Sequence, residues 1–575
     1  MPRNLKEKAD ALLAAERGTI YKPQGASVSI ALAYPNTYAV GMSNLGVHQV
    51  YSLLNSRADT VCERVFLPDE DDREAYAAAP AGLFSLESKR PIKDFDILAF
   101  SVSFEQDYLN ILEILALSGI PVRKHERTDE HPLVVLGGIC SFFNPEPLAD
   151  FFDVVISGEG EEVVHEFVDA YNNSRAAGRQ ELLRSLGSIP GVYIPEFYEV
   201  FYHEDGTIRE RKSNQPYAPE RIVKRRSQDF NKAPAATVIL TPNTAFSSMY
   251  LAEITRGCGR HCRFCMAGYL YLPPRNLGIG QALVQARKAD SLCGKIGLVG
   301  AALSDYPDIG ELCSAVEGSI SVSSLRADSV QATLIDRLAK SGHKTISIAP
   351  EAGSERMRKV INKGVTEEDI LRAADMVFGS GIPNLKLYFI LGLPTETQAD
   401  IEEIISLSLK VREVQLRYAR PAGRIGRITL SVNSFVPKPF TPFQWEPMEA
   451  VDSLNKKQRF LEKAIKRIGN MNMIHDQPRW EYLQALLSRG DRRIGNLIQT
   501  AYEKHGDWKA AARELKLDMN FYVTRRRSFE ENLAWDFIDI GVRKDYLISE
   551  YHRAREEKFT PPCRVGSCKT CGVCE

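Results

Sequence analysis

The 575-residue sequence has almost no net charge and no long apolar run. Its formal charge at pH 7 is −1, because 73 Lys and Arg residues nearly balance 74 Asp and Glu residues. A charge this close to zero gives no general argument for a nucleic acid or an acidic membrane as a partner. No apolar stretch approaches the length of a membrane-spanning helix, and residues 1–18 have the pattern of an amphipathic helix, not that of a signal peptide. We therefore expect a cytoplasmic protein without a membrane span.

The chain has more cysteines than a protein in a reducing compartment needs for its structure. Eleven cysteines in such a compartment favour metal ligation over disulfides. Three lie together in "EITRGCGRHCRFCMAGY", residues 253–269, and four lie in the last thirteen residues. The scattered cysteines have the distribution typical of small buried apolar side chains. These are Cys62, Cys140, Cys293 and Cys313.

The first cysteine group, Cys258, Cys262 and Cys265, lacks a fourth cysteine beside it. Three thiolates at these spacings can converge on one metal centre, but they do not complete the four-cysteine ligation typical of an iron–sulfur cluster. Either a fourth ligand comes from a distant part of the chain, or one iron is left open. A zinc knuckle is the other alternative, for which His261 is the only extra ligand nearby.

Alternating strand-like and helical segments predict an α/β protein with two sheet domains. Residues 26–185 carry apolar runs without polar alternation, which is typical of a Rossmann-like, doubly wound parallel sheet. Residues 245–445 repeat β–α units and predict a partial (β/α)6 barrel of the TIM type. In both folds, ligands bind at the carboxyl ends of the strands. The expected strands are 27–35, 61–68, 96–103, 133–139 and 154–160 in the first domain, and 249–257, 295–303, 320–326, 344–350, 385–394 and 427–437 in the second.

Four shorter regions complete the expected organisation. They are an N-terminal helix over 1–25, a β-rich connector with a hairpin at a DG turn over 186–244, a helical C-terminal region over 446–560, and a cysteine-rich, metal-binding tail over 561–575.

Small and polar residues end several strands of the first domain. Their position predicts a cofactor site at this edge of the sheet. The alternative is that the small residues form ordinary tight turns. The candidates are Tyr34, Asn36, Ser101, Ser103, Gly137, Gly138 and Gly158.

The C-x3-C-x2-C loop follows the first strand of the second domain, and Phe264 precedes its last cysteine. In this respect the chain resembles the radical S-adenosylmethionine (SAM) superfamily over roughly residues 245–440. The resemblance implies that Cys258, Cys262 and Cys265 are the catalytic ligands of three irons of a [4Fe–4S] cluster, and that SAM binds the fourth iron. Reductive cleavage of SAM then gives a 5′-deoxyadenosyl radical, which requires an electron donor such as flavodoxin or ferredoxin.

The same resemblance implies SAM contacts after the later strands. Gly300 stays where the superfamily commonly has a Gly-Gly-Glu-type motif, although the residues around it differ. Arg326 is expected to neutralise the SAM carboxylate. The full set of candidates is Phe264, Gly300, Ser323, Arg326, Glu351, Gly353, Ser354, Ile390 and Gly392.

The first domain resembles the B12-binding-type domain that precedes many radical SAM cores. The segments that carry this resemblance are 34–46, 100–115 and 137–162, the last containing "NPEPLADF" and "GEGE". The combined pattern is similar to uncharacterised bacterial radical SAM proteins with a B12-binding domain, and it implies cobalamin at the strand ends. The D-x-H-x-x-G motif of other B12 proteins is absent, since His48 lacks the preceding aspartate. The alternative is a Rossmann-like domain that only packs on the barrel.

The second cysteine group consists of Cys563, Cys568, Cys571 and Cys574. Four thiolates within a dozen residues predict a second iron–sulfur cluster, and the first three match the spacing of plant-type ferredoxins. Structural zinc and a thiol relay are the alternatives.

With cobalamin, the favoured reaction is methyl transfer to an unactivated carbon. Sulfur or methylthio insertion that uses the second cluster is the alternative, and a non-catalytic iron–sulfur or corrinoid-binding protein is the alternative of another class. Basic clusters such as "VTRRRS" are more typical of solvated faces than of an RNA platform, so nucleic acid is not indicated as a partner. The substrate is not specified by these motifs.

Overall fold

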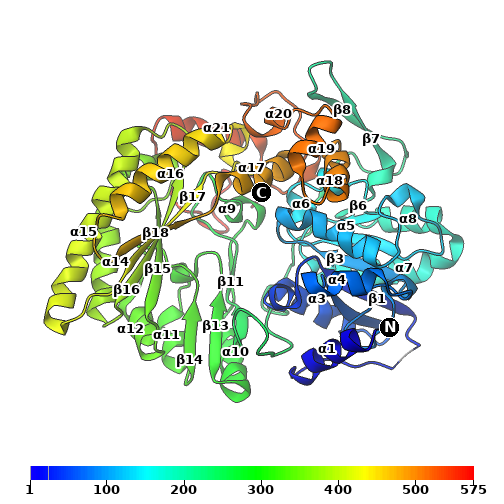
Figure 1. Ribbon diagram of the computed structural model, residues 1–575, viewed down its shortest axis with the longest axis horizontal. Coiled ribbons are helices and arrows are strands. Elements are labelled where there is room, and N and C mark those ends of the chain that lie inside the picture. The colour runs from blue at the N-terminus through cyan, green and yellow to red at the C-terminus, as the bar shows by residue number, and fades with distance from the viewer. Residues whose placement is uncertain (1, 24, 575) are drawn as a thin grey trace. The chain divides into compact units, whose positions relative to one another are not determined.

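The chain forms two compact units in a computed structural model that describes residues 2–23 and 25–574 (Figure 1). Unit 1 comprises 1–248, 487–519 and 530–540, and unit 2 comprises 249–486, 520–529 and 541–575. The residues expected to form one helical region, 446–560, are therefore divided between the two units.

Unit 1 is built on a six-stranded sheet with the order β2-β1-β3-β4-β5-β6. The first five strands are parallel and the short β6 is an antiparallel edge. Every residue of β1 is buried, as expected for a strand covered on both faces. The five predicted strands and the doubly wound fold class are confirmed. The strands are β1 (Val28–Tyr34), β2 (Thr60–Phe66), β3 (Ile97–Ser101), β4 (Leu133–Gly137), β5 (Val154–Ile156) and β6 (Val192–Tyr193).

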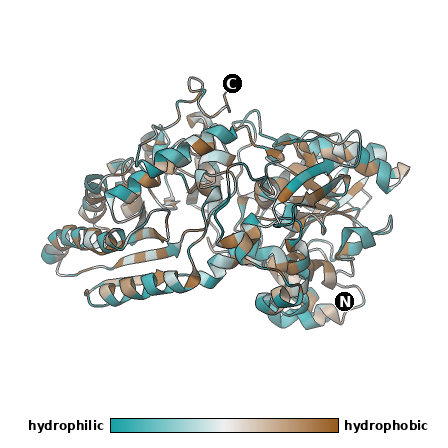
Figure 2. Ribbon diagram, turned by 90° about the horizontal axis from the view of Figure 1, so that it is seen from above, coloured by the Kyte–Doolittle hydropathy of each residue, from teal (hydrophilic) through white to brown (hydrophobic). Residues whose placement is uncertain are grey.

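Helices cover both faces of this sheet, and they turn apolar sides to it. The helices α3 (Leu45–Ser56) and α7 (Gly160–Ser174) pack together on one face, and α5 (Tyr108–Leu117) packs with α18 (Ile494–Glu503) on the other. Figure 2 shows teal and brown stretches side by side on the helices. Other helices of unit 1 are α1 (Arg3–Ala14), α4 (Glu70–Ala77), α8 (Arg179–Gly187) and α19 (Trp508–Glu514).

The predicted hairpin is present in the connector. The strands β7 (Tyr198–Tyr202) and β8 (Ile208–Ser213) pair antiparallel around the Asp205–Gly206 turn. A second short pair joins distant parts of the chain, because β9 (Ile222–Val223) pairs with β19 (Ile538–Asp539).

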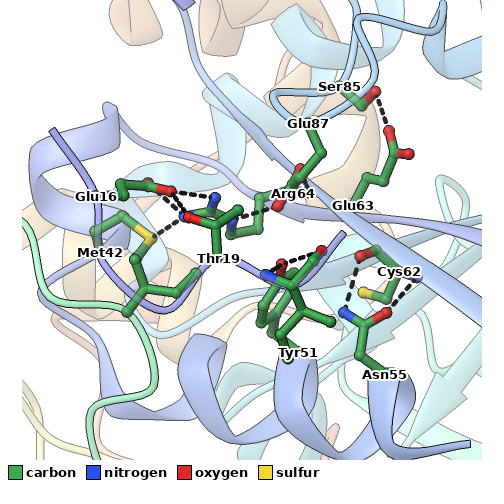
Figure 3. A network of polar contacts seen from close by, with 12 residues as sticks. Glu16, Thr19, Met42, Tyr51, Asn55, Cys62, Glu63, Arg64, Ser85 and Glu87 are labelled. Atoms are coloured by element: carbon green, nitrogen blue, oxygen red, sulfur yellow. Dashed lines mark hydrogen bonds and ion pairs between the residues drawn. The ribbon is translucent and has the colours of Figure 1, made fainter. Parts of the chain in front are cut away.

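A buried ion network fixes the segment after α1 against the sheet of unit 1 (Figure 3). The Arg64 guanidinium donates to Glu16 at 2.7 Å and to Glu87 at 2.7 Å, and the three side chains are at most 3% exposed. Burial raises the pKa of Glu87, whereas the contact with Arg64 holds the pKa of Glu16 below its ordinary value. Because one cation serves two buried carboxylates, loss of Arg64 would leave both uncompensated.

Unit 2 contains the predicted partial barrel. One parallel sheet has the order β10-β13-β14 and a second has the order β15-β16-β17-β18. A parallel bridge between Leu325 and Ile348 joins them. All six predicted strands are confirmed, and β18 adds a strand within the region expected to be helical. The strands are β10 (Tyr250–Glu253), β13 (Lys295–Val299), β14 (Ser319–Val322), β15 (Thr345–Glu351), β16 (Asn384–Leu391), β17 (Ile428–Ser434) and β18 (Met471–His475).

The two faces of these strands differ in burial. Along β16, Leu385, Leu387 and Phe389 are buried, while Lys386 and Tyr388 are half-buried. Helices flank the outer side of the strands (Figure 1). They include α10 (Ile279–Leu292), α11 (Ile309–Ala315), α12 (Ala332–Lys340), α14 (Glu367–Gly379), α15 (Gln398–Ala422) and α16 (Val451–Ile465). Among the described residues, no helix combines the length and apolar character needed to cross a membrane.

Candidate active site

The three clustered cysteines lie on a loop that a small strand pair closes. This cysteine loop, residues 257–274, begins after β11 (Thr255–Arg256) and ends at β12 (Arg275–Asn276), and the two strands pair antiparallel. Gly257 has a φ of +80°, and a Cβ there would lie 2.3 Å from the Tyr271 carbonyl oxygen. The loop therefore needs glycine at its entrance. The position after the first barrel strand is the predicted one.

The three thiols lie close enough to affect one another. Burial and then the neighbouring thiols of Cys262 and Cys258 raise the pKa of Cys265 to about 12. Burial and the Cys262 thiol likewise raise the pKa of Cys258. Among the described residues, no group of three or more His, Cys, Asp or Glu side chains is arranged to hold a single metal ion, and this applies to both cysteine groups. Of the three loop cysteines, Cys262 is buried and the other two are half-buried. Adjacent thiols without a fourth cysteine suit a multi-iron cluster, whose ligands bind different irons.

Cations lie beside these thiols. The Arg326 guanidinium is 3.9 Å from the Cys262 sulfur, and it also donates to Asp328 at 3.0 Å and to the Lys363 carbonyl at 2.7 Å. The Lys363 ammonium lowers the pKa of Cys265 against the larger effects above. Two buried cations offset the negative charge that three thiolates bring, so the residues present fit an anionic cluster.

Two arginines inside the loop hold its backbone in place. Arg260 donates to Asp305 at 2.6 Å and to Asp328 at 3.0 Å. Arg263 is fully buried and donates to Glu550 at 3.1 Å. Its other nitrogens donate to three carbonyl oxygens, those of Lys359, Val360 and Lys558, and to the Thr560 hydroxyl. The spacing of the cysteines is thus fixed from both sides of the loop.

Asn362 and the helix α21 (Lys544–Arg555) complete this support. The Asn362 amide donates to the carbonyl oxygens of Arg260 at 3.1 Å and His261 at 3.3 Å, and its oxygen accepts from the Thr560 amide at 2.8 Å. The His261 ring packs against Tyr269 and Tyr546, the latter on α21. His261 therefore faces aromatic rings; its Nδ1 is buried without a hydrogen-bond partner.

Of the nine residues predicted to bind SAM, two lie near the cysteine loop and have charged partners there. Arg326 and Glu351 lie near the cysteine loop: Lys363 donates to Glu351 at 3.0 Å, and Glu351 has a φ of +67° at the end of β15. A left-handed backbone at a glutamate costs about 1 kcal/mol or more and is typical of functional sites. Phe264 is half-buried on the loop, Ser323 is exposed after β14, and Ile390 is half-buried on β16.

Four further SAM candidates have structural partners within the fold. A Cβ at Gly353 would lie 2.2 Å from the Ile404 amide nitrogen of α15, and one at Gly300 would lie 2.2 Å from the Thr255 hydroxyl. Ser354 caps α13 (Glu355–Val360) and donates to Asp400 at 2.6 Å. The Gly392 amide donates to Glu396 at 3.1 Å. Their SAM contacts stay a prediction.

Several candidates of unit 1 gather where the strand order of its sheet reverses, between β1 and β3. The Asn36 amide donates to Asp107 at 2.8 Å, and the Asn44 amide donates to Ser103 at 3.1 Å. Burial raises the pKa of Asp107 to about 6. Ligands of doubly wound sheets bind at this edge. Tyr34 and Ser101 end the two strands concerned, so the candidates Tyr34, Asn36, Ser101 and Ser103 lie at the same edge of the sheet, and their contact with a cofactor stays a prediction.

The glycine candidates of unit 1 meet the chain's own backbone. A Cβ at Gly138 would lie 2.4 Å from the Val102 carbonyl oxygen, and one at Gly158 would lie 2.2 Å from the Arg225 carbonyl oxygen. Gly137 accepts from the Val102 amide at 2.9 Å. This supports the tight-turn alternative for Gly138 and Gly158, whereas a Cβ at Gly137 would lie 3.6 Å from its nearest neighbour, which is an ordinary contact.

Both ring nitrogens of His48 form hydrogen bonds with the backbone. Its Nδ1 accepts from the Val238 amide at 3.2 Å, and its Nε2 lies 3.0 Å from the Met42 carbonyl oxygen, to which it donates. Burial lowers the pKa of His48 to about 4, so the ring is neutral. Neither nitrogen is available to a metal.

The cysteine tail, residues 563–574, lies against the cysteine loop within unit 2. The Cys563 amide donates to the Gly259 carbonyl oxygen at 2.7 Å. The neighbouring thiols of Cys568, Cys571 and Cys574 add to burial in raising the pKa of Cys563 to about 11. The four thiols therefore lie near one another, but they are not arranged around a single metal ion, and the second metal site stays a prediction.

Sequence reasoning missed the residues that support the loop. Lys363, Asn362 and Glu550 carry no motif and reach the loop only through folding. Arg260 and Arg263 stand between the cysteines in "CGRHCRFC". Two arginines in so short a loop indicate that carboxylate groups lie near it in the folded protein.

Two family profiles match this chain. "Radical SAM proteins, N-terminal" matches residues 46–195, and "Radical SAM superfamily" matches residues 252–408. The chain is similar to an uncharacterised protein of Methanocaldococcus jannaschii, with 30% identity over 519 residues that cover 88% of this chain and 98% of the relative.

More distant relatives share parts of the chain. An uncharacterised methyltransferase of Pyrococcus horikoshii is 24% identical over 364 residues, which cover 59% of this chain and 71% of the relative. A tRNA-2-methylthio-N(6)-dimethylallyladenosine synthase of Chloroherpeton thalassium is 28% identical over 188 residues, which cover 30% and 41%.

Among solved structures, the cobalamin-dependent SAM radical enzyme OxsB is similar with a TM-score of 0.47 and 16% identity, covering 92% of this chain and 79% of that chain. The profile match over the barrel coincides with the loop that carries Cys258, Cys262 and Cys265. With the near-complete match to the Methanocaldococcus protein, these findings show that the chain belongs to the radical SAM superfamily of enzymes.

Proposed function

We propose that this radical SAM enzyme transfers a methyl group to an unactivated carbon with the help of cobalamin. The superfamily implies a [4Fe–4S] cluster and SAM, and a reduced cluster of this kind supplies the electron that cleaves SAM to a 5′-deoxyadenosyl radical. The protein's own contribution is to bind, orient and shield these groups.

The cysteine loop supplies the cluster ligands and their charge balance. Cys258, Cys262 and Cys265 offer three thiolates, and Arg326 and Lys363 offset their charge. Arg326 already pairs with Asp328, so we propose that it orients the cluster more than it binds the SAM carboxylate. Glu351, held by Lys363 in a strained backbone, is our candidate for a hydrogen bond to SAM.

The observation that carries the cobalamin proposal is the polar edge of unit 1. Asn36, Asn44, Ser103 and Asp107 bring amide, hydroxyl and carboxyl groups to the position where doubly wound sheets bind their ligands. Such groups suit the amide-rich periphery of a corrinoid. Because both His48 nitrogens have partners, we propose that cobalamin binds without a histidine ligand from that position.

The similarity to the uncharacterised methyltransferase of Pyrococcus supports methyl transfer as the reaction. That relative is matched over 71% of its length, which includes more than the barrel alone.

The test is cobalt and deoxyadenosine analysis of one preparation. The protein is purified anaerobically, reconstituted with iron, sulfide and cobalamin, and freed of unbound cobalt before metal analysis. About one cobalt per chain, lost in a variant with Asn36→Leu and Asn44→Leu but kept in Cys258→Ala, would support the proposal. No cobalt in a protein with an intact iron–sulfur spectrum would refute cobalamin binding.

Reductive SAM cleavage separates an enzyme from a binding protein. With a chemical reductant, we expect 5′-deoxyadenosine from the wild type and none from Cys262→Ala. Absence of the product from the reconstituted wild type would favour the non-catalytic alternative.

Sulfur or methylthio insertion is the second candidate. It is favoured by the contact of the cysteine tail with the cysteine loop and by the similarity to the Chloroherpeton methylthio-adenosine synthase. This chain covers only 41% of that relative, so its tRNA substrate is not carried over. Transfer of isotopically labelled sulfur from a tail reconstituted with labelled sulfide into the product would identify this reaction.

A further inference from the structure

We propose that Cys563, Cys568, Cys571 and Cys574 hold a second iron–sulfur cluster that passes electrons from an external one-electron carrier to the cluster on the cysteine loop. The proposal rests on radical SAM membership and does not depend on cobalamin or methyl transfer. The observations that support it are the conformation of the tail and its contacts with the cysteine loop.

The tail is folded as a compact cradle. Gly566 and Gly572 have φ values of +81° and +96°, which let the chain turn twice between the cysteines. A Cβ at Gly572 would lie 2.8 Å from the Arg543 side chain, so the turn is pressed against the start of α21. The Arg543 amide donates to the Cys571 carbonyl oxygen at 3.0 Å, and its guanidinium donates to the Thr570 carbonyl oxygen at 3.0 Å.

The position of this cradle suits an anionic centre. The tail meets α21 at its N-terminal end, where the helix dipole favours negative charge. The Thr570 hydroxyl lies 3.3 Å from the Cys568 sulfur, close enough to donate a hydrogen bond to an ionised thiolate there. Four thiolates around a cluster gain from both effects.

A backbone hydrogen bond connects the tail to the cysteine loop. The Cys563 amide donates to the Gly259 carbonyl oxygen at 2.7 Å, and the Cys563 Cβ is 3.1 Å from where a Cβ at Gly259 would lie. Gly259 is bonded directly to Cys258. The path from one thiol to the other therefore contains three residues, with one hydrogen bond as its only non-covalent step.

A second set of contacts joins the same two segments. Tyr546 on α21 packs against His261 with ring centroids 6.0 Å apart. The Cys571 and Cys568 thiols add to burial in raising the pKa of Tyr546, which shows that the ring lies close to the tail as well. Glu550, one helical turn further on, binds Arg263 of the loop. The helix α21 thus fixes the distance between the two thiol groups.

The outer side of the tail is open to a carrier. Arg564, Val565 and Lys569 are exposed, and Val565 has 56% of its surface accessible. Two basic side chains beside an apolar one favour an acidic electron-transfer protein of the ferredoxin or flavodoxin class.

Each transfer moves one electron and leaves no product on the protein. The reduced carrier is oxidised by one electron and the tail cluster is reduced. The tail cluster is then oxidised as the loop cluster gains the same electron, which SAM consumes on cleavage. No proton or further reactant is needed.

The metal content is tested with cysteine variants of the full chain after anaerobic reconstitution. A variant with Cys258→Ala, Cys262→Ala and Cys265→Ala isolates the tail, and we expect iron and sulfide with the electron paramagnetic resonance of a reduced cluster. Zinc in place of iron in this variant, or no metal, would overturn the proposal. Because this protein lacks the loop cluster, the result does not depend on any catalytic activity.

The electron path is tested by the rate of loop-cluster reduction. In Cys568→Ser and in Cys571→Ala, reduction of the loop cluster by reduced flavodoxin, followed by stopped-flow absorbance, is expected to slow at least tenfold. Reduction by a small chemical reductant should change little. Cys293→Ala, which removes a cysteine outside both groups, is the matched control. Wild-type reduction rates in both tail variants, with the tail cluster lost, would refute the relay even if the iron assignment holds.

Discussion

At the residue scale, the cysteine loop depends on charges that the fold has buried. Arg263 has no exposed surface, and Glu550 has 3%. Burial lowers the pKa of Arg263, although the Glu550 carboxylate acts in the opposite direction. Burying an ion pair of this kind costs desolvation free energy, and removing one partner costs more, because the other charge then stays buried without compensation.

Arg263→Ala should lower the free energy of unfolding by about 3–5 kcal/mol, because Glu550 would stay buried without its cation. Denaturant unfolding followed by tryptophan fluorescence measures this, with iron per chain as a second readout. The matched control is Arg3→Ala, which breaks an exposed pair with Glu7 and should leave stability nearly unchanged. Equal effects of the two substitutions would contradict the role given to Arg263.

Asp107 gives a prediction with a defined pH range. Its pKa is about 6 in the folded protein, above the ordinary value of 3.8. Between these values the folded protein binds a proton that the unfolded chain has lost, so stability falls as the pH rises through this range. Above pH 6 the cost reaches about 3 kcal/mol, since one pKa unit corresponds to about 1.4 kcal/mol.

Asp107→Asn removes that titration while an amide oxygen still accepts from Asn36 and Asn110. Relative to the wild type, the variant should therefore gain stability between pH 4 and pH 7.5. Thermal unfolding at both pH values tests this. A constant difference between variant and wild type would show that Asp107 keeps an ordinary pKa.

At the element scale, the buried strands can be predicted from the sequence, whereas the side chains that support the site cannot. The predicted strands are apolar runs whose burial follows from composition alone, as in β1 and β4. β18 was missed because "MNMIH" mixes polar residues into an edge strand, where Ile474 stays 44% exposed. The cysteines of the site were predictable from local spacing. Arg263 and Glu550 were not, because they are 287 residues apart and only packing brings them together.

The contact of β15 with α15 depends on the absence of a side chain. Gly353 follows β15, and a Cβ there would lie 2.2 Å from a backbone nitrogen, which has no free rotamer to move away. Gly353→Ala should cost about 1–3 kcal/mol by forcing the helix outward.

Gly280→Ala is the control for this substitution, since nothing lies within 4 Å of its Cβ position and its φ is ordinary. Melting temperatures of both variants should separate clearly. A neutral Gly353→Ala would contradict the role in helix packing given to this glycine.

At the scale of the whole molecule, each of the two units is built from several separate stretches of the sequence. Unit 1 includes residues 487–519 and 530–540, which follow most of unit 2 in the sequence. Within unit 1, Arg492 donates to the buried Glu146 at 3.1 Å, and Asn144 donates to the carbonyl oxygens of Ser488 and Gly490.

A fragment of residues 1–248 should therefore fail to melt cooperatively, because Glu146 and Asn144 would stay buried without partners. Joining residues 487–519 to it through a flexible linker should restore a cooperative transition and near-ultraviolet circular dichroism. If the fragment alone already shows both, these contacts are not required for folding.

The link between Arg263 and Glu550 also has a consequence for the timing of biosynthesis. The loop with its three cysteines leaves the ribosome 287 residues before the carboxylate that fixes it. During that interval neither α21 nor the cysteine tail exists to cover the thiols. Iron and sulfide can therefore reach the nascent loop without passing α21 or the tail, and access from this side ends when α21 docks onto the loop.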